Sequence, residues 1–144
     1  MATRMQLFRE VIDIWRDTQD IDAVLDRMTD DVVWHYSAAT KEPKIGKQGA
    51  REFLDSFKEN VRNPRWRIFS YAENGDTLFV EGVDEFDTAD GKVVVIPYAG
   101  VIEFRGDLIC GWRDYFDRAI GDAGAKGEPL PPFAAELADR PAVA

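Results

Sequence analysis

The sequence predicts an α+β fold, in which three helices pack on the concave side of a cone-shaped, curved antiparallel (mixed) sheet. Before residue 62, apolar residues recur three times at helical spacing. From residue 65 to residue 117, runs rich in β-branched and aromatic residues alternate with turn signals, as in strands joined by hairpins. After Ala119 the composition shifts to Gly, Ala and Pro, so we expect one domain over residues 1–120 and a C-terminal tail over residues 121–144.

The three predicted helices cover residues 3–16, a short stretch from about Asp20, and residues 48–61. Thr3 is a suitable N-cap for the first helix. Each segment carries one apolar stripe, and we interpret the stripes of the first two as core-facing rather than as part of a cofactor site. The stripes are Met5, Phe8, Val11, Ile12 and Trp15; Ile21, Val24, Leu25 and Met28; and Ala50, Phe53, Leu54, Phe57 and Val61.

One strand is expected over residues 32–36, and four more form a meander over residues 65–71, 77–86, 92–104 and 108–117. Asn74-Gly75 is a typical hairpin turn between the first two strands of the meander. Pro97 lacks a backbone N–H, which predicts an edge position or a bulge in the third. Within the tail, a short helix is expected over residues 132–138.

Alternation along these strands places two aspartates on otherwise apolar faces. Asp114 shares its face with Leu108, Cys110, Trp112 and Phe116. Asp84 shares its face with Leu78, Val80, Gly82 and Phe86. The neighbouring strands contribute Ile96 and Tyr98 on one shared face, and Trp34 and Tyr36 on another.

A carboxylate on an apolar face is unfavourable unless it is paired, hydrogen-bonded or protonated. Asp114 and Asp84 therefore have either a structural role, such as pairing with an arginine, or a catalytic role at the floor of a pocket. If both face one cavity, desolvation and mutual repulsion raise the pKa of at least one carboxyl group. One aspartate can then act as a base and the other as an acid, while Tyr36 and Tyr98 donate hydrogen bonds to a substrate oxygen or a water.

Composition argues against several classes of function. The formal net charge of -9 disfavours binding to nucleic acid or to an anionic membrane surface. We expect neither a signal peptide nor a membrane-spanning helix, because no apolar run has the length that these need. The single Cys110 excludes an internal disulfide and fits a cytoplasmic location. With one histidine and no nucleotide-binding glycine motif, we expect no metal and no cofactor.

The segment Gly111-Trp112-Arg113-Asp114-Tyr115-Phe116-Asp117, with Gly100-Val101-Ile102-Glu103-Phe104 and Val83-Asp84, resembles the limonene-1,2-epoxide hydrolase family. That family belongs with the SnoaL-like polyketide cyclases and ketosteroid isomerases to the nuclear transport factor 2-like superfamily. The resemblance is specific over residues 78–118, architectural over the first 70 residues, and absent from the tail. It implies a homodimer and an aspartate–arginine–aspartate triad. In that triad Asp114 matches the residue that activates water, and Asp84 matches the acid that protonates the epoxide oxygen.

The chain departs from the hydrolase pattern at three positions. Gly82 stands at the position of the arginine that bridges the two aspartates. Trp34 and Tyr36 stand at the positions where the hydrolases have a tyrosine and an asparagine that help to hold the water. Arg67 on a neighbouring strand could supply the missing cation. The small Gly82 is expected to enlarge the pocket for a bulkier or aromatic substrate, and His35 is expected to be structural rather than a general base.

The leading hypothesis is a cofactor-independent acid/base enzyme, an isomerase, cyclase or lyase, that acts on a hydrophobic oxygenated small molecule. Asp114 would be its base. The alternatives are an epoxide hydrolase and a non-catalytic binding or dimerisation module. The expected pocket wall comprises Trp34, Gly82, Phe86, Ile96, Trp112 and Phe116. The outer face of the sheet is expected to pack against a second subunit through Phe79, Val83, Ile109 and Tyr115.

Overall fold

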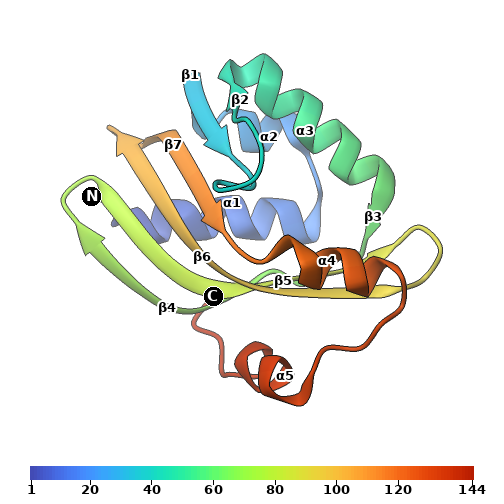
Figure 1. Ribbon diagram of the computed structural model, residues 1–144. Coiled ribbons are helices and arrows are strands. Elements are labelled where there is room, and N and C mark those ends of the chain that lie inside the picture. Colours follow the sequence, from blue (N-terminus) through green and yellow to red (C-terminus); the bar gives the residue numbers. More distant parts are fainter.

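The computed structural model describes residues 1–144 and consists of a curled, seven-stranded mixed sheet with helices on both of its faces (Figure 1). The predicted α+β class is therefore confirmed. The elements in chain order are α1 (Arg4–Asp17), α2 (Ile21–Leu25), β1 (Met28–His35), β2 (Lys44–Ile45), α3 (Gly46–Asn60), β3 (Val61–Arg62), β4 (Arg67–Asn74), β5 (Thr77–Thr88), β6 (Val93–Arg105), β7 (Leu108–Tyr115), α4 (Arg118–Ala125) and α5 (Pro132–Ala138). None of the helices has the length and apolarity that a membrane crossing requires.

The sheet has the strand order β2-β1-β7-β6-β5-β3, and β4 also pairs with β5. Only the pairing of β1 with β7 is parallel. The long hairpin of β5 and β6 pairs without interruption from Thr77–Glu103 to Asp87–Val93. Because no bulge interrupts this stretch, the alternation of side chains predicted for β5 and β6 holds throughout it.

Pro97 occupies the edge position that its missing N–H requires. It pairs with Val83 of β5 on one side. On its other side the partner strand β7 begins pairing with β6 only at Ala99. Residues 93–98 of β6 therefore form a free edge, and α4 packs along this part of the strand.

Helices α1, α2 and α3 pack on the concave side of the sheet, as predicted (Figure 1). Thr3 caps α1 through a capping box with Gln6. The apolar stripes of these helices and the concave face of the sheet form one core cluster, in which Phe8, Ile12 and Ile102 are fully buried. This core supports the residues of the candidate site.

A bulge near the start of β7 changes the predicted side-chain pattern there. Glu103 pairs with Gly111, but the next residue, Phe104, pairs with Ile109, so Cys110 is an extra residue in β7. Ile109 is consequently buried in the core, whereas Leu108 is 37% exposed. The assignment of Leu108 and Cys110 to the apolar face, and of Ile109 to the outer face, was wrong for this reason.

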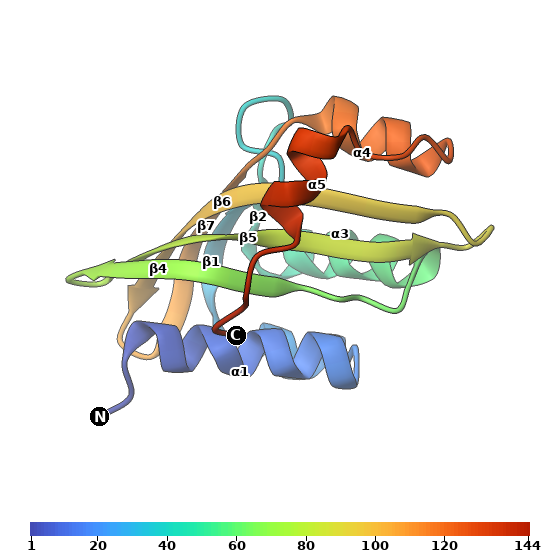
Figure 2. The same ribbon diagram turned by 90° about the horizontal axis from the view of Figure 1, so that it is seen from below.

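The C-terminal residues form an ordered part of the molecule. Helix α4 spans the boundary expected between residues 120 and 121, and α5 coincides with the helix expected over residues 132–138. Figure 2 shows α5 lying across the outer face of the sheet, where Ala138 covers the fully buried Val83. Beyond α5, Val143 and Ala144 form backbone hydrogen bonds with Ile68 of β4.

The tail therefore covers part of the outer face on which a dimer contact was expected. Of the four side chains named for that contact, Val83 and Ile109 are buried within the chain. Phe79 and Tyr115 remain 44% and 47% exposed. Dimerisation through this face stays a prediction.

Candidate active site

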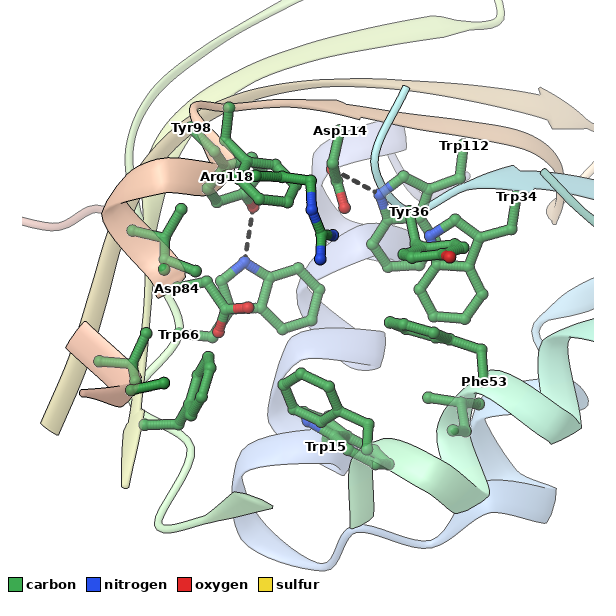
Figure 3. A pocket seen from close by; sticks show the side chains of 18 of the residues that line it. Trp15, Trp34, Tyr36, Phe53, Trp66, Asp84, Tyr98, Trp112, Asp114 and Arg118 are labelled. Carbon is green, nitrogen blue, oxygen red and sulfur yellow. Dashed lines mark hydrogen bonds between the residues drawn. The ribbon is translucent and has the colours of Figure 1, made fainter. Parts of the chain in front are cut away.

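A cavity of about 350 Å³ lies between the concave face of the sheet and helices α1, α3 and α4 (Figure 3). Sixteen of its 22 lining residues are hydrophobic when its two tyrosines are counted with them, and all four tryptophans of the chain are among these sixteen. Apolar cavities with a few convergent polar groups are typical of small-molecule sites. The polar side chains that line this one are Tyr36, Asp84, Thr88, Tyr98, Asp114, Arg118 and Asp122.

Asp114 reaches this cavity from the end of β7, beyond the bulge. Its register partner on β6 is Gly100, where a Cβ atom would lie 3.0 Å from Asp114 Oδ1. The glycine thus leaves room for the carboxyl group. The indole Nε1 of Trp112 donates a hydrogen bond to Oδ1 at 3.0 Å. Desolvation raises the pKa of Asp114 to about 8; the Trp112 hydrogen bond opposes this rise and repulsion from Asp84 adds to it.

Asp84 lines the same cavity from β5, where it pairs with Ile96 of β6. Desolvation raises its pKa to about 7. No side chain or backbone group of the protein donates a hydrogen bond to it, which leaves both of its oxygens available to a ligand. The two carboxyl groups therefore titrate near neutrality, and they do so as a pair because the charge on Asp84 raises the pKa of Asp114.

Tyr98 provides a hydroxyl group beside the two carboxyl groups. It is 8% exposed, and its hydroxyl oxygen accepts a hydrogen bond from Trp66 Nε1 at 2.6 Å. Desolvation, with repulsion from Asp114, raises the pKa of Tyr98 well above its ordinary value, so the hydroxyl keeps its proton. Since the Trp66 bond occupies the oxygen as an acceptor, the hydroxyl proton is free to point at a substrate.

Three stacked indole rings hold these polar groups in place. Trp112 lies between Trp34, with ring centroids 4.7 Å apart, and Trp66, with centroids 5.8 Å apart. Within this stack, Trp112 orients Asp114 and Trp66 orients Tyr98. The Nε1 of Trp34 is buried and has no hydrogen-bond acceptor in the protein. A buried donor without a partner is unfavourable, and a ligand oxygen is one group that could satisfy it.

The structure brings most of the predicted site residues together. Asp114, Asp84 and the two tyrosines all line the cavity, with Tyr36 stacked on Phe53 of α3. The expected wall residues that line it are Trp34, Phe86, Ile96, Trp112 and Phe116. Three predicted residues, Gly82, Arg67 and His35, do not line it.

Gly82 does not enlarge the cavity as expected, because the backbone of β4 fills the adjacent space. A Cβ atom at this position would collide with the carbonyl oxygen of Arg67. The Arg67 side chain is directed away from the cavity, since it pairs with Glu85 at 3.3 Å and donates to the carbonyl of Ala138 at 3.2 Å. His35 is the last residue of β1, in register with Arg113 of β7.

Sequence reasoning did not identify the contribution of α4. This helix brings Arg118, Gly121, Asp122 and Ala125 to the mouth of the cavity. The sequence contains one signal for the start of this helix, which is the N-capping residue Asp117. Its side chain accepts a hydrogen bond from the Ala119 N–H at 2.9 Å. The aromatic stripe of α1, interpreted as core, also lines the cavity through Trp15, and α3 contributes Phe53 and Phe57.

Residues 8–112 match the SnoaL-like domain model. The chain belongs to the SnoaL-like family. None of the curated proteins matches it. Its site residues Asp84 and Tyr98 fall inside the matched region, while Asp114 and the whole of α4 follow it.

Solved structures, among them a nuclear transport factor 2-like protein from Burkholderia pseudomallei with a TM-score of 0.71 and 21% identity over 83% of this chain and 94% of that one, confirm the nuclear transport factor 2-like fold. A protein of ketosteroid isomerase-like fold from Catenulispora acidiphila, in complex with trimethylamine, is similar with a TM-score of 0.75 and 19% identity, over 90% of this chain and 100% of that one. An epoxide hydrolase of limonene epoxide hydrolase type from M. tuberculosis is similar with a TM-score of 0.73 and 20% identity, over 85% and 89%. TerC, co-crystallised with polyporic acid, is similar with a TM-score of 0.73 and 22% identity, over 85% and 98%.

Proposed function

We propose that this SnoaL-like chain is a cofactor-independent acid/base enzyme, an isomerase, cyclase or lyase acting on a hydrophobic oxygenated small molecule. The observation that carries the proposal is a pair of aspartates, Asp84 and Asp114, lining one aromatic cavity with pKa values of about 7 and about 8. A general acid or base works best when its pKa lies near the working pH. The two relatives with bound trimethylamine and polyporic acid support a small-molecule ligand.

In the proposed reaction, a carboxylate removes a proton next to a substrate carbonyl, and Tyr98 donates a hydrogen bond to the oxygen as negative charge develops on it. The proton then returns to another carbon or leaves with a departing group. The second carboxyl group, in its acid form, donates a hydrogen bond to the same oxygen and keeps its proton, so each turnover moves a single proton. Walls of tryptophan and phenylalanine hold a flat, apolar skeleton, and water leaves the cavity when the substrate fills it.

We assign the base to Asp114 because Trp112 Nε1 fixes its Oδ1 and leaves Oδ2 free for the substrate. In the unliganded site Asp84 ionises first, since it has the lower pKa. Part of the higher pKa of Asp114 comes from repulsion by the ionised Asp84, so the form with Asp114 ionised and Asp84 protonated differs from the resting form by less free energy than the two pKa values suggest. That difference is small compared with a catalytic barrier, so the reactive form is readily reached.

Proton exchange tests this proposal without knowledge of the natural substrate. Apolar cyclic ketones are incubated with the protein in deuterium oxide, and loss of the proton next to the carbonyl is followed by NMR. Asp114→Asn is expected to slow exchange by about 100-fold or more. Asp17→Asn, which changes an exposed aspartate at the end of α1, is the matched control and should leave the rate unchanged. An Asp114→Asn protein that exchanges at the wild-type rate would refute the assignment.

Epoxide hydrolysis is the second candidate, favoured by the similarity to the M. tuberculosis epoxide hydrolase and by the two aspartates. Steric exclusion at Gly82 rules out a bridging cation there, so this reaction would need its cation from Arg118 at the cavity mouth. Incubation with limonene oxide and cyclohexene oxide tests it. Diol formation that depends on both Asp84 and Asp114 would support hydrolysis, and the absence of any diol would remove it.

A further inference from the structure

Arg118 has surroundings that set it apart from the other arginines of the chain. It is the first residue of α4, and its guanidinium extends into the cavity on the side of Asp114 and Tyr36 (Figure 3). Every other arginine donates to a carboxylate or to a backbone carbonyl. Arg118 forms no ion pair and no hydrogen bond with the protein. Its five N–H donors are therefore unused in a half-buried position.

The carboxyl groups around Arg118 do not neutralise it. Asp84 and Asp114 line the same cavity, but neither lies within ion-pair distance of the guanidinium, and desolvation raises the pKa of both toward the neutral form. Asp122, four residues further along α4, is exposed at the rim and is not paired with it either. Arg118 is the only cationic side chain among the lining residues.

A planar guanidinium is suited to binding two oxygens of a carboxylate or one strongly acidic oxygen. The rest of the cavity wall is largely aromatic and includes all four tryptophans of the chain. The cavity thus combines an apolar space for a flat skeleton with one unpaired positive charge at its mouth.

We propose that Arg118 determines substrate specificity by binding an anionic oxygen, a carboxylate or the oxygen of an acidic enol or phenol, on an aromatic substrate. The proposal deepens the proposed function, on which it rests, by naming the substrate class. Arg118 anchors the anionic end at the mouth of the cavity, and the apolar part of the substrate lies among the tryptophans. This places the remaining reactive atoms toward Asp114 and Tyr98.

Two ligands of the same shape test this role: naphthoate, which is anionic, and naphthamide, which is neutral. Their dissociation constants are measured by isothermal titration calorimetry at neutral pH and low ionic strength. The wild-type protein is expected to prefer naphthoate by about tenfold or more, the factor expected for one charge-assisted hydrogen bond. Arg118→Met should abolish this preference while leaving naphthamide binding within about twofold, and Arg118→Lys should retain part of it. Lys41→Met, which removes an equal charge from an exposed loop, should behave as wild type.

Equal affinity of the wild-type protein for both ligands would overturn the proposal, as would binding of neither ligand. A preference for naphthoate that survives in Arg118→Met would overturn it as well. The same titration with Asp114→Asn separates this proposal from the proposed function. Asp114→Asn should still prefer naphthoate, whether or not Asp114 is the base. Failure of the catalytic assignment of Asp114 and failure of the binding role of Arg118 therefore give different results.

Discussion

Replacing Asp114 with asparagine should stabilise the protein at alkaline pH. In the folded protein Asp114 holds its proton up to about pH 8, whereas the unfolded chain releases it near the ordinary value of 3.8. Between these values the folded state binds more protons than the unfolded state, so the free energy of unfolding falls as the pH rises. The stabilising contribution of the protonated Asp114 is therefore fully present below about pH 4. It decreases as the pH rises and is lost as the pH passes about 8.

The size of the effect follows from the pKa difference. A rise of about four units corresponds to ~6 kcal/mol at ~1.36 kcal/mol per unit. This is an upper limit, because the carboxyl group faces a cavity that admits water and the site relaxes around the charge. We therefore expect Asp114→Asn to match the wild type near pH 4 and to exceed its free energy of unfolding by ~2–4 kcal/mol near pH 9.

Urea denaturation followed by circular dichroism at the two pH values measures this difference directly. Asp17→Asn is the control, since an exposed aspartate should change the free energy of unfolding by less than ~0.5 kcal/mol at either pH. If the free energies of unfolding of Asp114→Asn and the wild type differ by the same amount at both pH values, the pKa of Asp114 is not raised in the folded protein. The reasoning from desolvation would then be refuted.

Three further predictions concern the support of the site and the fold. Trp112→Phe keeps the aromatic ring but removes the hydrogen bond to Asp114, so the pKa of that carboxyl should rise by about one unit, seen as an alkaline shift of the pH–rate profile. Gly82→Ala should lower the free energy of unfolding by ~2–4 kcal/mol in urea, because its Cβ collides with the β4 backbone; a neutral result would mean that this space is open. Deletion of residues 143–144 removes backbone hydrogen bonds to β4 and should cost ~1–3 kcal/mol by the same assay, whereas an unchanged midpoint would show that the terminus contributes nothing.

The positions of Asp84 and Tyr98 could be predicted because strand alternation depends only on local geometry. Strands β5 and β6 pair without a bulge along the whole region that carries both residues, so period-two reasoning reaches the correct face. Asp114 was placed correctly for a narrower reason: it lies beyond the bulge in β7. Residues before that bulge were assigned to the wrong face, since nothing local marks Cys110 as an extra residue.

The surroundings of Gly82 and the role of α4 depend on contacts between distant segments. The space beside Gly82 is filled by β4, which also has an irregular register with β5. Helix α4 contains Gly121 and Gly124, which weaken the helical signal in the sequence. These glycines allow the helix to approach β6 closely, since Gly121 packs against Ile96 and Gly124 against the backbone of Val94. Arg118 could not be assigned to the site without this packing.

Asp84 and Asp114 line one apolar cavity, and desolvation makes both carboxyl groups titrate near neutral pH. The most direct test is an NMR titration of the side-chain carboxyl carbons of Asp84 and Asp114 in carbon-13-labelled protein. Both carboxyl groups should titrate between about pH 6 and pH 9, and Asp84→Asn should lower the pKa of Asp114 because it removes the repulsion between them. Two independent titrations near pH 4 would show that neither carboxyl group is adapted to acid/base chemistry and would favour a non-catalytic binding module.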